Sequence, residues 1–306
     1  MLTNSIKKNS VYTFDWDDNI LHMPTKIKMD KKDNENWIPI EVEPAEFAII
    51  RGDKDNYRIR NNDPVQAFDE FLDYGPRGDQ SFIQDVIISV SKEEYGPSWK
   101  TFLNCIKQAN LFGIVTSRSH EFFSIRKGVE YIIDRCLTLE EKRKMYINCC
   151  NFGLNDIMKD SFYAYELRNN IDKVDYSNFS KNSAVSKYLD ICKYYGVGLP
   201  FSEDFKKEFN LSTESKMTIQ EAKKMSINRL MVISDKLFTK IYTNGDIEVF
   251  NLGFSDDDKK TIDFIKTFFD EYAHHFRGSK LCVYDTSDRK IKGGIKTKYY
   301  EEYDKY

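Results

Sequence analysis

The sequence predicts a mixed α/β fold built on a mostly parallel sheet. Short apolar runs lie at Ser10–Phe14, Leu111–Val115 and Leu281–Tyr284, as buried strands do. Stretches with apolar residues at helical spacing separate these runs, and the clearest of them spans Lys259–His275. Strands joined by helices of this length pair in parallel, and ligand-binding groups gather beyond the carboxyl ends of such strands.

The composition is that of a globular chain without a membrane span. The 306 residues include 22 Phe and 19 Tyr, enough for a sizeable core in one large domain with insertions or in two smaller ones. The formal net charge of -3 argues against a strongly basic nucleic-acid footprint. None of the six cysteines forms a C-x-x-C pair, and no apolar run approaches the ~20 residues of a membrane span. We therefore expect a cytoplasmic protein. The Lys- and Asn-rich composition is typical of an AT-rich, for example viral, genome, which would place it in the host cytoplasm or the virion.

An inserted segment is expected directly after the first strand. Residues 24–97 hold charge clusters, turn signals and a strand-like run at Trp37–Val42. We assign residues 1–23 and 98–306 to the α/β core, with an extra segment at about 196–250. The inserted segment 24–97 is cap-like and is a candidate surface for a protein partner.

Four further elements are expected within the core. Apolar runs predict strands at Phe162–Leu167 and Leu230–Ile233, and Asn244–Gly245 is a strong hairpin signal. Helical spacing predicts a helix over Ala184–Tyr195, ended by Gly196.

The strongest chemical signal is a pair of acids at the end of the first strand. Asp15 and Asp17 follow the buried run and lie one residue apart. One carboxylate can attack a phosphorus atom, and the other can protonate the leaving oxygen and later activate water. Such an acidic site approaches a phosphate only with a hard divalent cation, and Mg²⁺ is the usual choice. The alternative interpretation is an Asp-rich turn on the surface.

This run resembles the first motif of the haloacid dehalogenase superfamily, hydrophobic residues followed by D-x-D-x-[TVN]. The resemblance implies a doubly wound, Rossmann-like sheet, with Asp15 as the nucleophile and Asp17 as the general acid/base. It also implies that Asp15 and the backbone carbonyl of Asp17 help to hold magnesium. Asn19 stands where the family most often has Thr.

The end of the next strand resembles the family's second motif. Gly113–Val115 is followed by Thr116, Ser117 and Arg118. A small hydroxyl is needed there to donate to a phosphate oxygen, and Thr116 fits best, with Ser117 as the alternative. Arg118 could bind the substrate, because a guanidinium suits phosphate well. An ordinary strand-to-helix turn with a polar cap would show the same pattern.

Two more segments resemble the remaining motifs of the family. Lys181, in a Ser-Lys pair before a helix, is the choice for the lysine that screens charge at the nucleophile; Lys187 is the rival, and a solvated surface lysine is the alternative. Asp256 and Asp257 follow an apolar run and are expected to complete the magnesium site. They could instead only cap the next helix. Asp285 belongs to a competing acid cluster, which the order of the elements disfavours.

The expected function is therefore hydrolysis of a phosphate monoester through an aspartyl-phosphate at Asp15. The substrate would be a phosphorylated small molecule, such as a nucleotide or a sugar phosphate, or a nucleic-acid end. The alternative is a catalytically silent fold of the same type, used as a structural or interaction module in a viral particle or another assembly. Transfer to a nucleic-acid end is a third option, which a basic groove leading to Asp15 would support.

Overall fold

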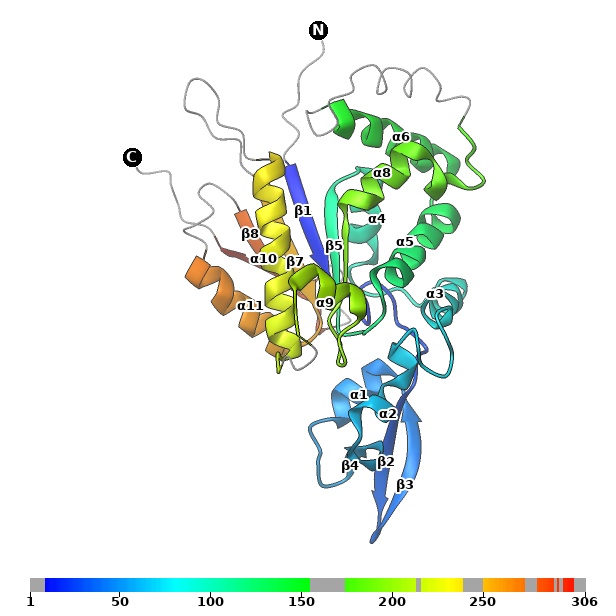
Figure 1. The fold of residues 1–306 in the computed structure, drawn as a ribbon, viewed down its shortest axis with the longest axis vertical. Helices are drawn as coiled ribbons and strands as arrows, with labels where there is room; N and C mark the ends of the chain where they lie inside the picture. Colours follow the sequence, from blue (N-terminus) through cyan, green and yellow to red (C-terminus); the bar gives the residue numbers. More distant parts are fainter. Residues whose placement is uncertain are drawn as a thin grey trace.

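A central sheet of six strands organises the computed structural model, which describes residues 9–154, 174–212, 216–238, 250–272, 280–288, 291 and 294–299. The strand order is β6-β5-β1-β7-β8-β9 (Figure 1). The strands are β1 (Asn9–Phe14), β5 (Leu111–Thr116), β6 (Lys193–Gly196), β7 (Phe250–Asp256), β8 (Lys280–Asp285) and β9 (Ile295–Tyr299).

The first strand lies in the middle of this sheet. It pairs in parallel with β5 on one side and with β7 on the other, so that Phe14 lies opposite both Ile114 and Ser255. β6 and β8 continue the parallel arrangement outward, and only β9 runs antiparallel, at the edge. The mixed α/β fold with a mostly parallel sheet is thus confirmed, and the carboxyl ends of β1, β5 and β7 meet at one edge.

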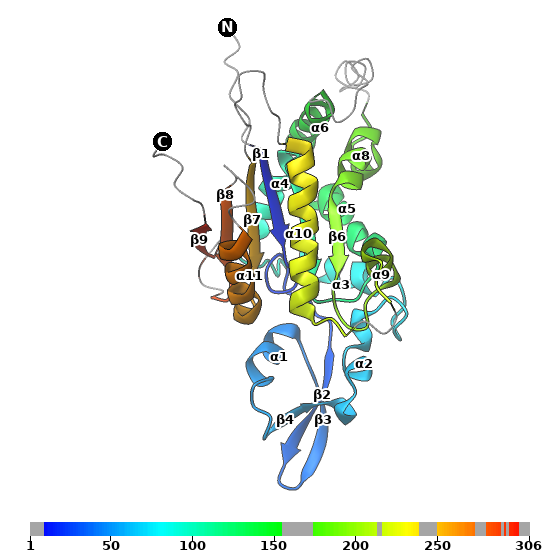
Figure 2. The same cartoon turned by 60° about the vertical axis from the view of Figure 1, so that its left-hand side comes forward.

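Helices flank the sheet on two sides (Figures 1 and 2). α10 packs across β5, β1 and β7, and α11 packs on β7 and β8. On the opposite side, aromatic contacts join β1 and β5 to α4 and α8, while α5 packs on β6. Among the described helices, none has the length and the apolar character needed to cross a bilayer. The helices of the core are α3 (Ser81–Ser91), α4 (Trp99–Lys107), α5 (Phe122–Cys136), α6 (Leu139–Leu154), α8 (Ser183–Ile191), α9 (Glu203–Phe209), α10 (Ile219–Phe238) and α11 (Lys259–Tyr272).

The strand expected at Leu230–Ile233 is wrong, because these residues lie inside α10. Ile227, Leu230 and Met231 are all buried, which is the 3–4 spacing of a helix face rather than the alternation of a strand. The helix expected over Ala184–Tyr195 ends at Ile191, and its last residues form β6. The elements expected at Phe162–Leu167 and Asn244–Gly245 lie outside the described residues.

The inserted segment builds a second, smaller sheet below the carboxyl ends of the main strands (Figure 1). The strand expected at Trp37–Val42 is present as β3. A small apolar cluster that includes Ile27, Val42 and Phe71 holds this part together, whereas Phe82 of α3 belongs to the main core. The elements of the insertion are β2 (Ile27–Asp33), β3 (Asn36–Val42), α1 (Pro44–Ile50), β4 (Tyr57–Ile59), η1 (Arg60–Asn62), α2 (Pro64–Ala67) and η2 (Asp69–Phe71).

Candidate active site

The acid pair lies where β1 leaves the sheet. Between the two acids, Trp16 is fully buried and packs against Phe82 and Phe102, with ring centroids 5.0 and 6.3 Å away. Successive side chains of an extended segment point to opposite sides. Burial of Trp16 in the core therefore turns Asp15 and Asp17 together toward a cavity, which both of them line.

The register of the sheet brings the second acid pair to the first. The backbone N–H of Asp15 donates to the Ser255 carbonyl at 3.0 Å, and Asn19 Nδ2 donates to Ser255 Oγ at 3.1 Å. Asp256 and Asp257 follow directly at the end of β7. One carboxylate oxygen from each of Asp15, Asp256 and Asp257 lies within 4.8 Å of the others.

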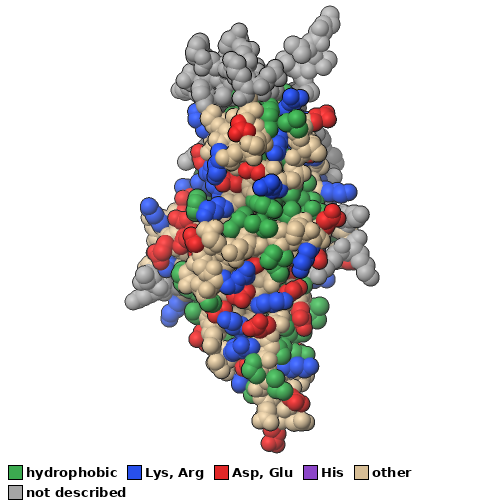
Figure 3. All heavy atoms as spheres, turned by 90° about the vertical axis from the view of Figure 1, so that its right-hand side faces the viewer, with side chains coloured by type: hydrophobic (Ala, Val, Ile, Leu, Met, Phe, Trp, Pro, Cys, Tyr) green, Lys and Arg blue, Asp and Glu red, His purple; other side chains and the backbone are tan. Residues whose placement is uncertain are grey.

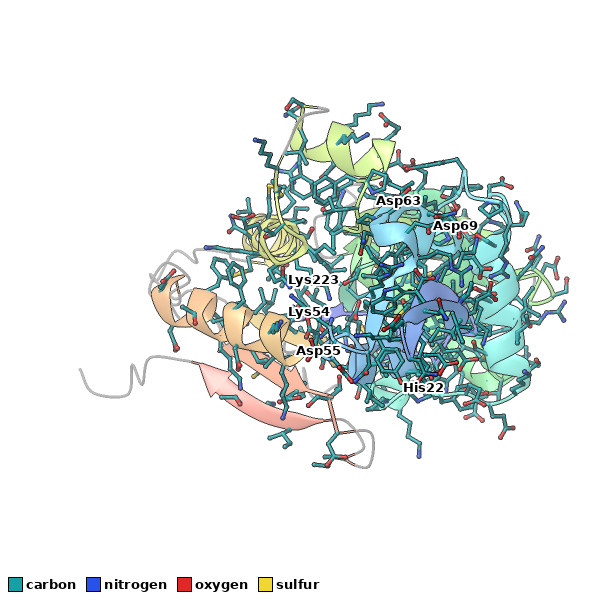
Figure 4. The ribbon with its side chains drawn as sticks, turned by 90° about the horizontal axis from the view of Figure 1, so that it is seen from below. His22, Lys54, Asp55, Asp63, Asp69 and Lys223 are labelled. Carbon is teal, nitrogen blue, oxygen red and sulfur yellow. The ribbon has the colours of Figure 1, made fainter. Side chains whose placement is uncertain are left out.

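A buried lysine from α10 completes this cluster. Lys223 Nζ lies 2.6 Å from Asp256 Oδ2 and 3.6 Å from Asp15 Oδ1, and its side chain is 1% exposed. Seen from below, it lies on the side of α10 that faces the insertion (Figure 4). α10 can approach the sheet this closely because β5 has Gly113, where a Cβ would lie 2.3 Å from a methyl carbon of Leu230.

Lys223 was not among the residues that the sequence pattern pointed to. Lys181 ends a short 3-10 turn and pairs with Glu130 of α5, and neither it nor Lys187 is among the residues that line the cavity. One signal could have identified Lys223: it shares a helix face with the buried residues Ser226 and Leu230, where a lysine needs a partner.

Of the polar side chains at the end of β5 and in the loop after it, some line the cavity and others are buried in the interior. Ser117 and Ser119 line the cavity, whereas Thr116 is fully buried and its Oγ accepts from the Arg118 N–H at 3.4 Å. Gly198 packs so closely on this loop that a Cβ there would lie 2.4 Å from the Ser117 carbonyl oxygen. The structure thus offers Ser117 and Ser119 as hydroxyl donors to a ligand.

Arg118 is turned away from the cavity, where it was expected to meet the substrate. Its guanidinium is fully buried, and Nε and Nη2 donate to the two oxygens of Asp17 at 2.8 and 2.7 Å. Nη2 also donates to Thr25 Oγ at 2.6 Å, and the group lies over the ring of Phe71. Two parallel bonds of this kind fix the orientation of a carboxylate, so Arg118 positions Asp17.

The cluster carries more negative than positive charge. Burial raises the pKa of Asp15 well above its usual range, because the opposing effect of Lys223 does not outweigh burial and the nearby acids. Burial, with Asp256 and Asp18 nearby, raises the pKa of Asp257 to about 8. Burial on its own would lower the pKa of Lys223, but the carboxylates of Asp15 and Asp256 raise it above its ordinary value.

A hard divalent cation fits this site. Among the described residues, Asp15 Oδ1 is buried without a hydrogen-bond donor, so it can serve as a ligand oxygen. Asp256 and Asp257 supply further carboxylate oxygens, which are the ligands that Mg²⁺ and Ca²⁺ prefer. The single positive charge of the Lys223 ammonium leaves part of the mutual repulsion of the acids uncompensated. A divalent cation would offset it.

The cavity around the cluster lies between the core and the insertion. Its volume is about 560 Å³. Acids of the core line one end, and residues of α1 and α2 in the insertion line the other. Arg51, directly after α1, contacts Asp258 at 2.8 Å and thereby joins the insertion to the start of α11.

Because His120, in the loop after Arg118, is buried, we expect the stability of the protein to depend on pH in a specific way. Burial, followed by the charges of Arg118 and Arg77, lowers the pKa of His120 well below its ordinary value, so the folded protein holds it neutral. The unfolded chain takes up a proton at this position as the pH falls below about 6.5. The stabilisation from His120 is thus present above that pH and is lost below it, at up to ~1.4 kcal/mol per pH unit.

The check is urea unfolding at pH 5.5 and 7.5. The free energy of unfolding of the His120→Gln variant should change less between these pH values than that of the wild type. An equal change in both proteins would contradict a neutral buried His120.

No family model, curated protein or solved structure matches this chain.

Proposed function

We propose that this protein is a magnesium-dependent phosphohydrolase that acts on phosphate monoesters through an aspartyl-phosphate at Asp15. One observation supports this most strongly: Asp15, Asp257 and Lys223 line a cavity at the carboxyl ends of β1 and β7, and the buried Asp256 pairs with Lys223 beside them. Adjacent parallel strands that each end in acids favour metal-assisted phosphoryl transfer.

The arrangement of strands also supports a doubly wound fold of the haloacid dehalogenase type. The strand that carries the first acid pair lies between β5, which ends at Thr116, and β7, which carries the second pair. The segments that resemble the first, second and fourth motifs are thus neighbours in space, whereas the segment with Lys181 is not part of the site. The insertion stands over them as a cap would.

In the first half of the proposed reaction, a carboxylate oxygen of Asp15 attacks the phosphorus atom. The bond from phosphorus to the ester oxygen breaks, and the Asp17 carboxyl gives its proton to the departing oxygen, so that an alcohol leaves. Lys223 screens the charge between Asp15 and the phosphate. Ser117 and Ser119 donate hydrogen bonds to the phosphoryl oxygens.

In the second half, the Asp17 carboxylate accepts a proton from water as the water oxygen attacks phosphorus. The bond from phosphorus to Asp15 breaks, which releases inorganic phosphate and restores both acids. Arg118 holds Asp17 in one orientation for both proton transfers. A bound Mg²⁺, held by Asp15, Asp256 and Asp257, would supply the positive charge that lets a phosphate approach these acids.

A second candidate function is a non-catalytic module of the same fold, which one observation favours. Both oxygens of Asp17 already accept hydrogen bonds from Arg118, so a leaving group must share Asp17 with that guanidinium. Such a module would bind a cation or a partner without turnover.

A nucleic-acid end is less well supported as the substrate than a small molecule. Lys and Arg side chains alternate with Asp and Glu side chains on the face of the molecule seen in Figure 3. Nucleic-acid binding relies on surfaces where positive charge dominates. On that face the charges of the described residues mix.

Metal removal tests the proposal. Purified protein with added Mg²⁺ should hydrolyse an aryl phosphate at least about 100-fold faster than with a chelator. Because the cation binds only the folded protein, it should also raise the thermal midpoint. Turnover that is indifferent to the metal, or a metal-bound protein that hydrolyses no phosphate monoester, would contradict the proposal.

A further inference from the structure

The cavity is much larger than a phosphoryl group needs. Its volume of about 560 Å³ falls within the ~300–1,000 Å³ of sites that enclose a whole organic ligand. The core lines it with the acids and Lys223 and also with Gln220, Lys259 and Lys260, while the insertion lines the rest. Space beyond the phosphoryl group is therefore available to the group esterified to the phosphate.

The wall that the insertion contributes is almost entirely apolar. It consists of Arg51, Ala48 and the larger side chains Ile27, Pro44, Phe47, Pro64, Phe68 and Phe71. Among these residues Arg51 alone carries a hydrogen-bonding side chain, and it is paired with Asp258. Sugar or glycerol hydroxyls placed against this wall would lose water without gaining a hydrogen-bond partner, which is unfavourable.

The aromatic rings of this wall form a row. Phe47 and Phe68 pack edge to face with centroids 5.4 Å apart, and Phe68 and Phe71 do the same at 5.7 Å. Aromatic rings attract further rings in edge-to-face or offset contact, in addition to the gain from area burial. A flat apolar ring is thus the group that this end of the cavity accepts best.

We propose that the preferred substrate is a phosphate monoester whose alcohol carries an apolar aromatic ring, held against the Phe47 and Phe68 wall of the insertion. That the substrate carries a phosphoryl group rests on the proposed function. That it carries an aromatic ring rests on the side chains of the insertion alone. The insertion thus selects the substrate, while the core performs the chemistry.

Rate comparison needs leaving groups of similar reactivity. Benzyl phosphate and glycerol 1-phosphate both release a primary alcohol, so a difference between them reports recognition rather than leaving-group strength. We expect kcat/KM for benzyl phosphate to exceed that for glycerol phosphate at least about tenfold, because burying a ring contributes more than about 1.4 kcal/mol. Equal values would overturn the inference.

Substitution at Ala48 tests the place of the ring. Ala48 lines the cavity but is exposed, so Ala48→Trp fills the space without disturbing the core of the insertion. Ile49, the next residue of α1, is 81% exposed and does not line the cavity, so Ile49→Trp is the matched control. Only the first variant should lose the preference for benzyl phosphate.

A binding measurement separates this inference from the proposed function. Benzylphosphonate and methylphosphonate cannot be hydrolysed, and their affinities can be measured by calorimetry in Mg²⁺ buffer. Ala48→Trp should weaken benzylphosphonate binding at least about tenfold and leave methylphosphonate binding unchanged. That result in a protein without turnover would refute the phosphatase and retain the ring site. Equal binding of the two phosphonates to the wild type would overturn the ring site whatever the turnover.

Discussion

Asp15→Asn should abolish turnover and at the same time stabilise the metal-free protein. An amide nitrogen cannot attack phosphorus, so we expect kcat to fall by at least about 10⁴-fold. Burial and the neighbouring acids raise the pKa of Asp15, which means that the folded state holds its charged form at a cost. The amide removes that charge without changing the shape of the side chain. Aryl phosphate hydrolysis and thermal unfolding in a chelator measure the two effects.

The opposite signs of these effects distinguish a nucleophile from a structural residue. A merely structural Asp15 would lose stability and activity together when it is replaced. Asp285→Asn is the matched control, because Asp285 ends β8, next to Asp256 in register, but does not line the cavity. This control should keep wild-type turnover. Full turnover in Asp15→Asn would refute the assignment.

Lys223→Met should reduce both catalysis and stability. Methionine keeps much of the length of the side chain but removes the ammonium that faces Asp15 and Asp256. Loss of one such stabilising group costs about 10²–10³-fold in turnover. Removing one partner of a buried ion pair destabilises a protein by about 3–5 kcal/mol. Kinetics at saturating substrate and urea unfolding check the two values.

A comparison with Lys181→Met decides which lysine serves the site. Lys181 is more than half exposed and pairs with Glu130 of α5, so its loss should leave turnover near the wild-type value and change stability by less than about 1 kcal/mol. Loss of turnover in Lys181→Met, with turnover retained in Lys223→Met, would contradict the assignment of Lys223 to the site.

The acids of the site could be predicted because their signal is local. Asp15 directly follows an apolar run, and Asp256 and Asp257 follow another after three residues. Each pattern indicates a buried strand with a polar carboxyl end. Parallel pairing then brings these ends to one edge whatever the intervening sequence contains. The same reasoning correctly placed β1, β5 and β8.

Lys223 and Arg118 could not be placed in this way, because their partners are distant in the sequence. A lysine in a charged helix looks solvated until the helix is known to pack its Lys223 face over Asp256. Arg118 adjoins the second motif, but Thr25 and Phe71 of the insertion surround its guanidinium and direct it to Asp17. The apolar run at Leu230–Ile233 is too short for its period to distinguish a strand from a buried helix.

A crystal structure of the protein grown with Mg²⁺ and beryllium fluoride, a mimic of the phosphoryl group, tests the nucleophile and the metal site together. We expect the fluoride adduct on a carboxylate oxygen of Asp15, with the cation held between Asp15, Asp256 and Asp257. An unmodified Asp15 would contradict its role as the nucleophile, and a cation bound away from these carboxylates would contradict their role as metal ligands.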